Sequence, residues 1–104
     1  MAASEKIAPV HPGEILLTDV LEPMGLSQSR FARLLGVPPN RINAIIRGQR
    51  SITADTAVRL GRCLGTSAEF WLGLQAEYDL EVARDTLEGV LEQEVTVIRS
   101  ADAA

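Results

Sequence analysis

Cysteine and histidine are almost absent from this chain of 104 residues, and their scarcity excludes two kinds of site. Cys63 is the only cysteine, so no disulfide can form within the chain. His11 is the only histidine, so the Cys and His ligands of a structural zinc site are lacking. We interpret Cys63 as a small, half-buried helix residue. His11 precedes Pro12 and Gly13, which is typical of a helix start rather than of a catalytic base.

Long apolar runs are absent as well. No stretch approaches the roughly 18 consecutive apolar residues of a membrane-spanning helix, and the N-terminus lacks the basic flank and apolar stretch of a signal peptide. A nucleophile with a neighbouring base and a glycine loop for phosphate are also missing. We therefore expect one small cytoplasmic domain that is not an enzyme, uses no cofactor or metal and contacts no membrane.

Charge of both signs is present but segregated. Between Gln28 and Arg62 lie seven arginines and one acid, Asp55, so this block has a net charge of +6. The rest of the chain has three basic residues and thirteen acids, a net charge of −10, and the whole chain is −4. Such asymmetry favours two partners of opposite sign, an anion such as nucleic acid for the middle and something basic for the end.

Apolar residues at helical spacing predict an all-α fold of five helices. The first runs from about Pro12 to Met24 and ends at Gly25. Ser27 is a favourable N-cap for the second, and Gly36 ends it. The inward faces of the second, third and fourth helices are their periodic apolar residues: Phe31, Leu34 and Leu35, then Ile42, Ile45 and Ile46, then Ala57, Leu60 and Leu64.

The end of the chain is predicted to hold one more helix and a short extension. Ser67 opens the fifth helix, which continues to about Leu91. Its large side chains are expected to fill the core beneath the first helix: Phe70, Trp71, Leu74 and Tyr78. The terminal "EVTVIRSA" is rich in β-branched residues and is predicted to be a short strand or a loose tail.

The third helix begins at Pro38 and Pro39 and ends at Gly48, so only the corner "GVPP" separates it from the second helix. This arrangement is a helix-turn-helix, which leaves the polar face of the third helix free to enter a major groove. That face consists of Asn40, Arg41, Asn43, Ala44 and Arg47. Asparagine pairs with adenine and arginine with guanine through two hydrogen bonds each. We assign phosphate contacts to Arg47 and to the flanking Ser27, Gln28, Ser29, Arg50, Ser51 and Thr53.

The stretches "HPGEIL", "LSQSRFARLLGVPPNRINAIIRG", "ITADTAVRL" and "FWLGLQAEYDL" resemble the HigA-type antitoxins, a branch of the lambda-repressor-like (XRE) helix-turn-helix regulators. The resemblance covers about Val10 to Leu80. It implies a five-helix homodimer that binds a palindromic operator in its own promoter and represses its operon. It also implies a partner, a small basic RelE-like toxin that cleaves mRNA on the ribosome.

The resemblance further implies which side chains contact bases, namely those of the first turn and the next exposed turn of the third helix: Pro39, Asn40, Arg41, Asn43 and Ala44. Gln28 matches the phosphate-contacting glutamine of the family. Many relatives carry a polar side chain where this chain has Pro39. Base contacts should therefore depend more on Asn40, Arg41 and Asn43.

The chain divides into a tail (1–9), a helix-turn-helix domain (10–80) and a C-terminal helical extension and tail (81–104), which matches no motif. The acidic residues of this end form either a solvated face or a docking surface for a basic toxin: Asp79, Glu81, Asp85, Glu88, Glu92 and Glu94. Two other functions remain open, a stand-alone XRE-type regulator without a toxin and a helical module that binds only proteins. The Asn/Arg surface speaks against the second.

Overall fold

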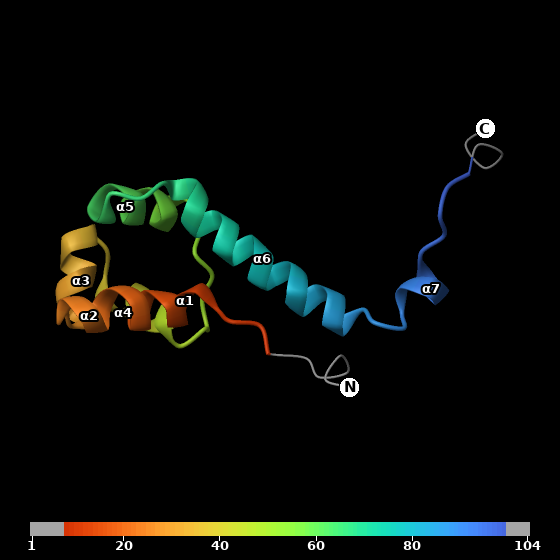
Figure 1. Cartoon of the computed structure of the whole chain (residues 1–104), viewed down its shortest axis with the longest axis horizontal. Helices are drawn as coiled ribbons and strands as arrows, with labels where there is room; N and C mark the ends of the chain where they lie inside the picture. The colour runs from red at the N-terminus through yellow and green to blue at the C-terminus, as the bar shows by residue number, and fades with distance from the viewer. Residues whose placement is uncertain (1–7, 100–104) are drawn as a thin grey trace.

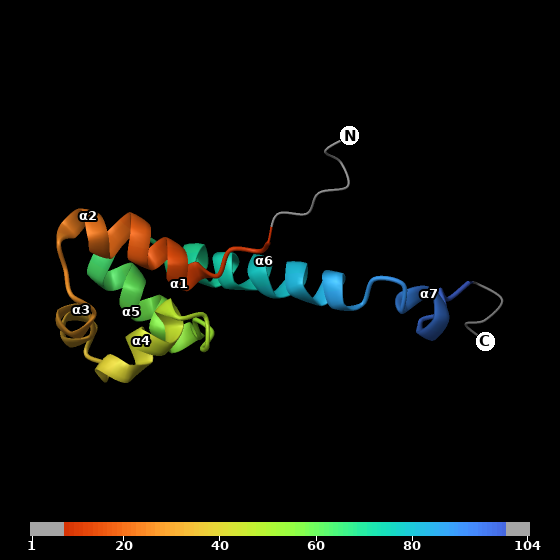
Figure 2. The same ribbon diagram turned by 90° about the horizontal axis from the view of Figure 1, so that it is seen from below.

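The computed structural model describes residues 8–99, and its regular elements over that range are all helical (Figure 1). Their bounds are α1 (Pro12–Ile15), a π-helical turn η2 (Leu16–Leu21), α2 (Glu22–Met24), α3 (Gln28–Leu35), α4 (Pro39–Ile46), α5 (Ala54–Leu64), α6 (Ala68–Thr86) and α7 (Leu91–Glu94). Figure 2 shows the continuous α1–η2–α2 rod and the α3–α4 pair on opposite edges of the helical body. In both views α6 extends away from that body toward α7.

The helix boundaries follow the signals in the sequence. The first four predicted helices and the start of the fifth are confirmed, with Ser27 and Ser67 as N-caps whose hydroxyl oxygens accept hydrogen bonds from the backbone three residues ahead. The π-helical turn within the first helix was not predicted. It ends two residues before Pro23, whose ring would clash with the carbonyl four residues earlier in a regular α-helix. We attribute the wider turn to this proline.

The hydrophobic core lies where the N-terminal rod, α3, α4, α5 and the start of α6 meet. Its buried residues are Leu16, Leu21, Phe31, Ala32, Leu35, Val37, Ile42, Ile45, Ile52, Ala57, Leu60 and Trp71. The indole Nε1 of Trp71 donates a hydrogen bond of 2.8 Å to the hydroxyl of Thr66, so its polar atom is satisfied inside the core. This set includes Phe31 and Leu35 of α3 and Ile42 and Ile45 of α4, which face inward as predicted.

Three predicted burials are wrong. Leu34 is 53% exposed because α3 turns Phe31, Ala32 and Leu35 inward, and the small Ala32 takes the place expected for Leu34. Phe70 is 49% exposed, and its ring lies nearly perpendicular to that of Trp71, with the ring centres 5.1 Å apart. Cys63 is exposed rather than half-buried.

The C-terminal prediction was partly wrong. α6 ends at Thr86 rather than near Leu91, because Gly89 lies in the turn that follows and has a φ of +82°, which a helix cannot adopt. Of the two alternatives predicted for "EVTVIRSA", a short strand or a loose tail, the strand is absent from the described residues: Val95–Arg99 has no regular structure, and Ser100 and Ala101 lie outside the described range. Most of the predicted tail 1–9 lies outside it too. Among residues 8–99, no helix combines the length and apolar character needed to span a membrane.

One buried polar side chain fastens the loop between α4 and α5 to α6. Gln75 is only 4% exposed, and its Oε1 accepts a hydrogen bond of 2.8 Å from the backbone N–H of Ile52. Its Nε2 donates to the carboxylate of Asp79 at 2.9 Å. The loop that follows α4 is therefore held by a satisfied hydrogen bond inside the core.

We expect Gln75→Met to destabilise the fold because it leaves the buried N–H of Ile52 without an acceptor. The loss should be about 1–3 kcal/mol, and Tm should fall by roughly 4–8 °C per kcal/mol for a domain of this size. Thermal unfolding followed by circular dichroism measures it. Gln93→Met, at an exposed position of α7, is the matched control, and an equal Tm for the two variants would contradict this role for Gln75.

Candidate DNA interface

The helix-turn-helix is built from α3, a three-residue turn and α4. Two backbone hydrogen bonds close the end of α3, from Val37 N–H to the carbonyl of Ala32 and from Gly36 N–H to that of Arg33. Pro38 then precedes α4 in an extended conformation, and Pro39 opens the helix at a position where no N–H is needed. The predicted motif and its corner are confirmed.

The backbone of α1 packs closely against the backbone at the end of α4, on the side opposite its polar face. A Cβ atom built on Gly13 would lie 1.8 Å from the carbonyl oxygen of Ile45, far inside any contact distance. Only glycine therefore allows α1 to pack on the end of α4. Because Ile42 and Ile45 are fully buried against this support, the opposite face of α4 is directed outward.

The predicted base-contact residues differ in exposure. Pro39 and Asn40 are exposed, whereas Arg41, Asn43 and Ala44 are half-buried. Asn40, Asn43, Ala44 and Arg47 follow one another at helical spacing along α4, so the structure brings them to one face of that helix. Which of these side chains contacts a base stays a prediction.

The predicted phosphate contacts surround this face at the start of α3, the end of α4 and the start of α5. All are exposed except the half-buried Gln28: Ser27, Ser29, Arg47, Arg50, Ser51 and Thr53. The side chain of Thr53 makes no capping hydrogen bond, although the residue occupies the N-cap position of α5. Within residues 8–99, Arg47 and Arg50 form no ion pair, which leaves both cations available to phosphate.

Arg41 is joined to a residue that the sequence reasoning did not assign. Its Nη1 donates to Oδ1 of Asp55 at 2.9 Å, and the same oxygen accepts a hydrogen bond of 2.8 Å from Nε of Arg59. These hydrogen bonds, that of Arg59 first, lower the pKa of the Asp55 carboxyl below its ordinary value. Asp55 therefore remains ionised and links the first turns of α4 and α5.

His11 is the N-cap of α1, which confirms its assignment to a helix start. Its Nδ1 accepts a hydrogen bond of 2.9 Å from the backbone N–H of Gly13, and its ring packs on that of Tyr78 in a T-shaped arrangement with the ring centres 4.9 Å apart. Burial lowers the pKa of His11, while the charge of Asp79 acts weakly in the opposite sense. The neutral ring is the form that can cap α1, because protonated Nδ1 has no lone pair to accept with.

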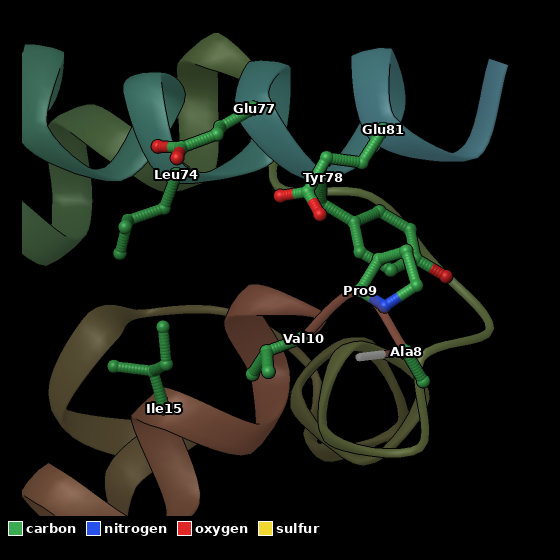
Figure 3. A pocket seen from close by; sticks show the side chains of 8 residues that line it. All are labelled: Ala8, Pro9, Val10, Ile15, Leu74, Glu77, Tyr78 and Glu81. Atoms are coloured by element: carbon green, nitrogen blue, oxygen red, sulfur yellow. The ribbon is translucent and has the colours of Figure 1, made fainter. Parts of the chain in front are cut away.

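A pocket of about 240 Å³ lies between the segment Ala8–Ile15 and α6. Figure 3 shows Ile15 of α1 and Leu74 of α6 directed toward one another in this pocket, with Pro9 near Tyr78. Its two carboxylates, Glu77 and Glu81, come from one face of α6. Over the part of the chain that the structure describes, no three His, Cys, Asp or Glu side chains are grouped as a metal site requires.

We predict that part of the pH dependence of stability comes from His11. Because its pKa is lowered in the folded state, the unfolded chain binds the proton first as the pH falls. The stabilisation is complete above the ordinary pKa of 6.5 and is lost as the pH falls from there through the folded-state pKa. His11→Asn keeps a capping side chain that does not titrate in this range, so it should remove this loss. Urea midpoints between about pH 5 and pH 8 test this, and identical pH profiles would contradict it.

The sequence matches the Helix-turn-helix family model over residues 17–71. Virulence-associated protein I of Dichelobacter nodosus is 47% identical over 89 residues, which are 86% of this chain and 82% of that protein. Antitoxin HigA-1 of Vibrio cholerae is 40% identical over 75 residues, 72% of this chain and 70% of the antitoxin.

Two solved structures are similar to this chain in fold as well as in sequence. An addiction module antidote protein of the HigA family from Coxiella burnetii is 44% identical with a TM-score of 0.83, over 88% of this chain and 100% of that one. Pseudomonas aeruginosa antitoxin HigA, solved with the higBA promoter, is 43% identical with a TM-score of 0.83, over 88% of this chain and 99% of that one. The chain therefore belongs to the helix-turn-helix family and, within it, to the HigA-type antitoxins.

Proposed function

We propose that this protein is a cytoplasmic, non-enzymatic antitoxin that binds operator DNA through α4, represses its own operon and neutralises a small basic RelE-like toxin. The observation that carries the proposal is the outward face of α4, an asparagine and arginine surface in a block of charge +6. The relationship to an HigA antitoxin solved with its promoter supports it.

In this proposal Asn40, Arg41 and Asn43 hydrogen-bond to base edges, while Pro39 and Ala44 supply apolar contact in the same groove. The seven residues that flank this surface contact the DNA backbone: Ser27, Gln28, Ser29, Arg47, Arg50, Ser51 and Thr53. Backbone contacts of this kind position α4 and make affinity depend on salt, whereas the base contacts set the sequence preference.

We also propose a homodimer whose protomers pair along α6. This helix carries exposed small and apolar residues at steps of four, four and three: Leu72, Ala76, Leu80 and Ala83. The spacing is that of the contact positions of paired helices, and Leu80 is 51% exposed among residues 8–99. A symmetric pair would place two copies of α4 about one DNA turn apart, roughly 34 Å, on the half-sites of a palindrome.

The C-terminal segment is the surface that we propose for the toxin. Its apolar side chains are mostly exposed, as docking requires: Leu87, Val90, Leu91, Val95, Val97 and Ile98. Acids lie among them, including Glu92 and Glu94, so a basic RNA-binding partner is attracted by charge and held by apolar burial. This division would leave α4 free for DNA while the toxin is bound.

We predict different losses for base and backbone contacts. Asn40→Ala should cost about 1–3 kcal/mol on a duplex selected by the wild type from a random library, and little on a random duplex. Arg50→Ala should weaken both duplexes alike and flatten the salt dependence. Fluorescence anisotropy measures the affinities, and footprinting should show two protected half-sites. Equal losses for Asn40→Ala on both duplexes would contradict the assignment.

We predict that removal of the residues after Leu91 weakens toxin binding and leaves operator affinity per dimer nearly unchanged. Glu92→Lys in the full chain should slow association with the toxin, since charge acts chiefly on the encounter rate. Co-expression with neighbouring small open reading frames and pull-down supplies the toxin, and surface plasmon resonance measures the rates. If no partner is recovered, the function reduces to that of a stand-alone regulator.

A further inference from the structure

Asp55 of α5 accepts hydrogen bonds from Arg41 of α4 and from Arg59 of α5. It occupies the second position of α5, where a negative charge is favourable beside the exposed N–H groups of a helix start. It is also the only acid in the block from Gln28 to Arg62, whose charge otherwise suits a polyanion. Its negative charge weakens the general attraction of this block to DNA. We therefore ask what else the Asp55 carboxylate contributes.

The position of the Asp55 carboxylate is fixed by Arg59, one turn further along α5. Nε of Arg59 donates to Oδ1 of Asp55 at 2.8 Å, and Nη1 of Arg59 donates to the carbonyls of Leu35 and Gly36 at 2.9 and 3.3 Å. Arg59 thus joins the carboxylate to the end of α3. The side chain of Asp55 is 57% exposed, and ion pairs with such exposure add only about 0–1 kcal/mol to stability. We therefore look for the effect of the Asp55 ion pairs in the position of the side chains rather than in stability.

The Asp55 carboxylate also fixes the position of Arg41, in the first turn of α4. Its side chain is 23% exposed, and its Nε is buried with no hydrogen-bond partner, so the stem of the side chain is enclosed. One Nη1 hydrogen is bound to Asp55, which leaves the outer part of the guanidinium free. An arginine on an open helix face would lose much rotamer freedom on binding, whereas this one is oriented beforehand.

We propose that Asp55 determines base specificity by positioning Arg41. The carboxylate holds the guanidinium so that its remaining Nη hydrogens donate to the two acceptors on the major-groove edge of guanine. The same negative charge disfavours rotation of Arg41 toward a phosphate and lowers affinity for DNA of other sequence. This inference rests on the proposed function, since it requires α4 to contact bases.

The experiment compares Asp55→Asn with the wild type on a duplex that the wild type has selected from a random library. Binding is measured to this duplex, to each of its single-base-pair variants and to a random duplex. Asp55→Asn should reduce discrimination at one base pair about five-fold or more, and should raise affinity for the random duplex. Glu69→Gln is the control variant. It removes the same charge from the first turn of α6 and should leave the ratios of affinity between the duplexes unchanged.

A double-mutant cycle separates positioning from general stabilisation. In an Arg41→Ala background, Asp55→Asn should leave the ratios of affinity between the duplexes unchanged, because Asp55 acts through Arg41. A loss of discrimination that persists in that background overturns the proposal, as does unchanged discrimination in Asp55→Asn alone. Nitrogen-15 relaxation of the Arg41 guanidinium gives a second measurement that needs no variant. Hindered rotation in the free wild type supports the proposal, and free rotation rejects it.

The design also distinguishes this inference from the proposed function. If the wild type enriches no sequence from the library, sequence-specific DNA binding fails, and the positioning of Arg41 fails with it. If the wild type enriches an operator and Asp55→Asn discriminates among its variants as well as the wild type does, only the role of Asp55 is rejected.

Discussion

The contact between the backbone of α1 at Gly13 and the carbonyl of Ile45 is the constraint on which the rest of the motif depends. It fixes how closely the first helix approaches the end of α4, and any side chain at position 13 would push the two apart. His11 caps α1 immediately before this contact and packs beside Gly48, just after α4. The first turn of α1 is therefore the support behind the DNA-binding face rather than a peripheral element.

Most of the fold could be predicted because its signals are local. Serine caps, glycine ends and the two prolines at the corner mark the helices one at a time, and apolar spacing identifies the inner sides of α3 and α4. Spacing does not say how far an apolar stripe extends around a helix. Leu34 and Phe70 lie at the margins of such stripes, and only the packing of neighbouring helices decides that they stay exposed.

The side-chain contacts that the sequence did not predict join positions far apart in the chain. Arg41 and Asp55 are 14 residues apart, Arg59 and Leu35 are 24 apart, and Ile52 and Gln75 are 23 apart. No periodic pattern connects such residues, because each contact depends on how the helices pack. One signal was present, since Asp55 is the single acid of a strongly basic block. For the candidate site, the sequence thus predicted the outward polar face of α4 but not the hydrogen bonds that Asp55 accepts from Arg41 and Arg59.

The corner between α3 and α4 has a consequence for the nucleic acid itself. Pro38 and Pro39 fix two φ angles before the chain folds, and the buried Val37 anchors the turn from inside, so the angle between the two helices has little freedom to adapt. Because this helix pair is rigid, the duplex has to bend and twist to fit it. If a dimer occupies two half-sites, as we propose, DNA that deforms easily between them should then be favoured, even at base pairs that no side chain touches.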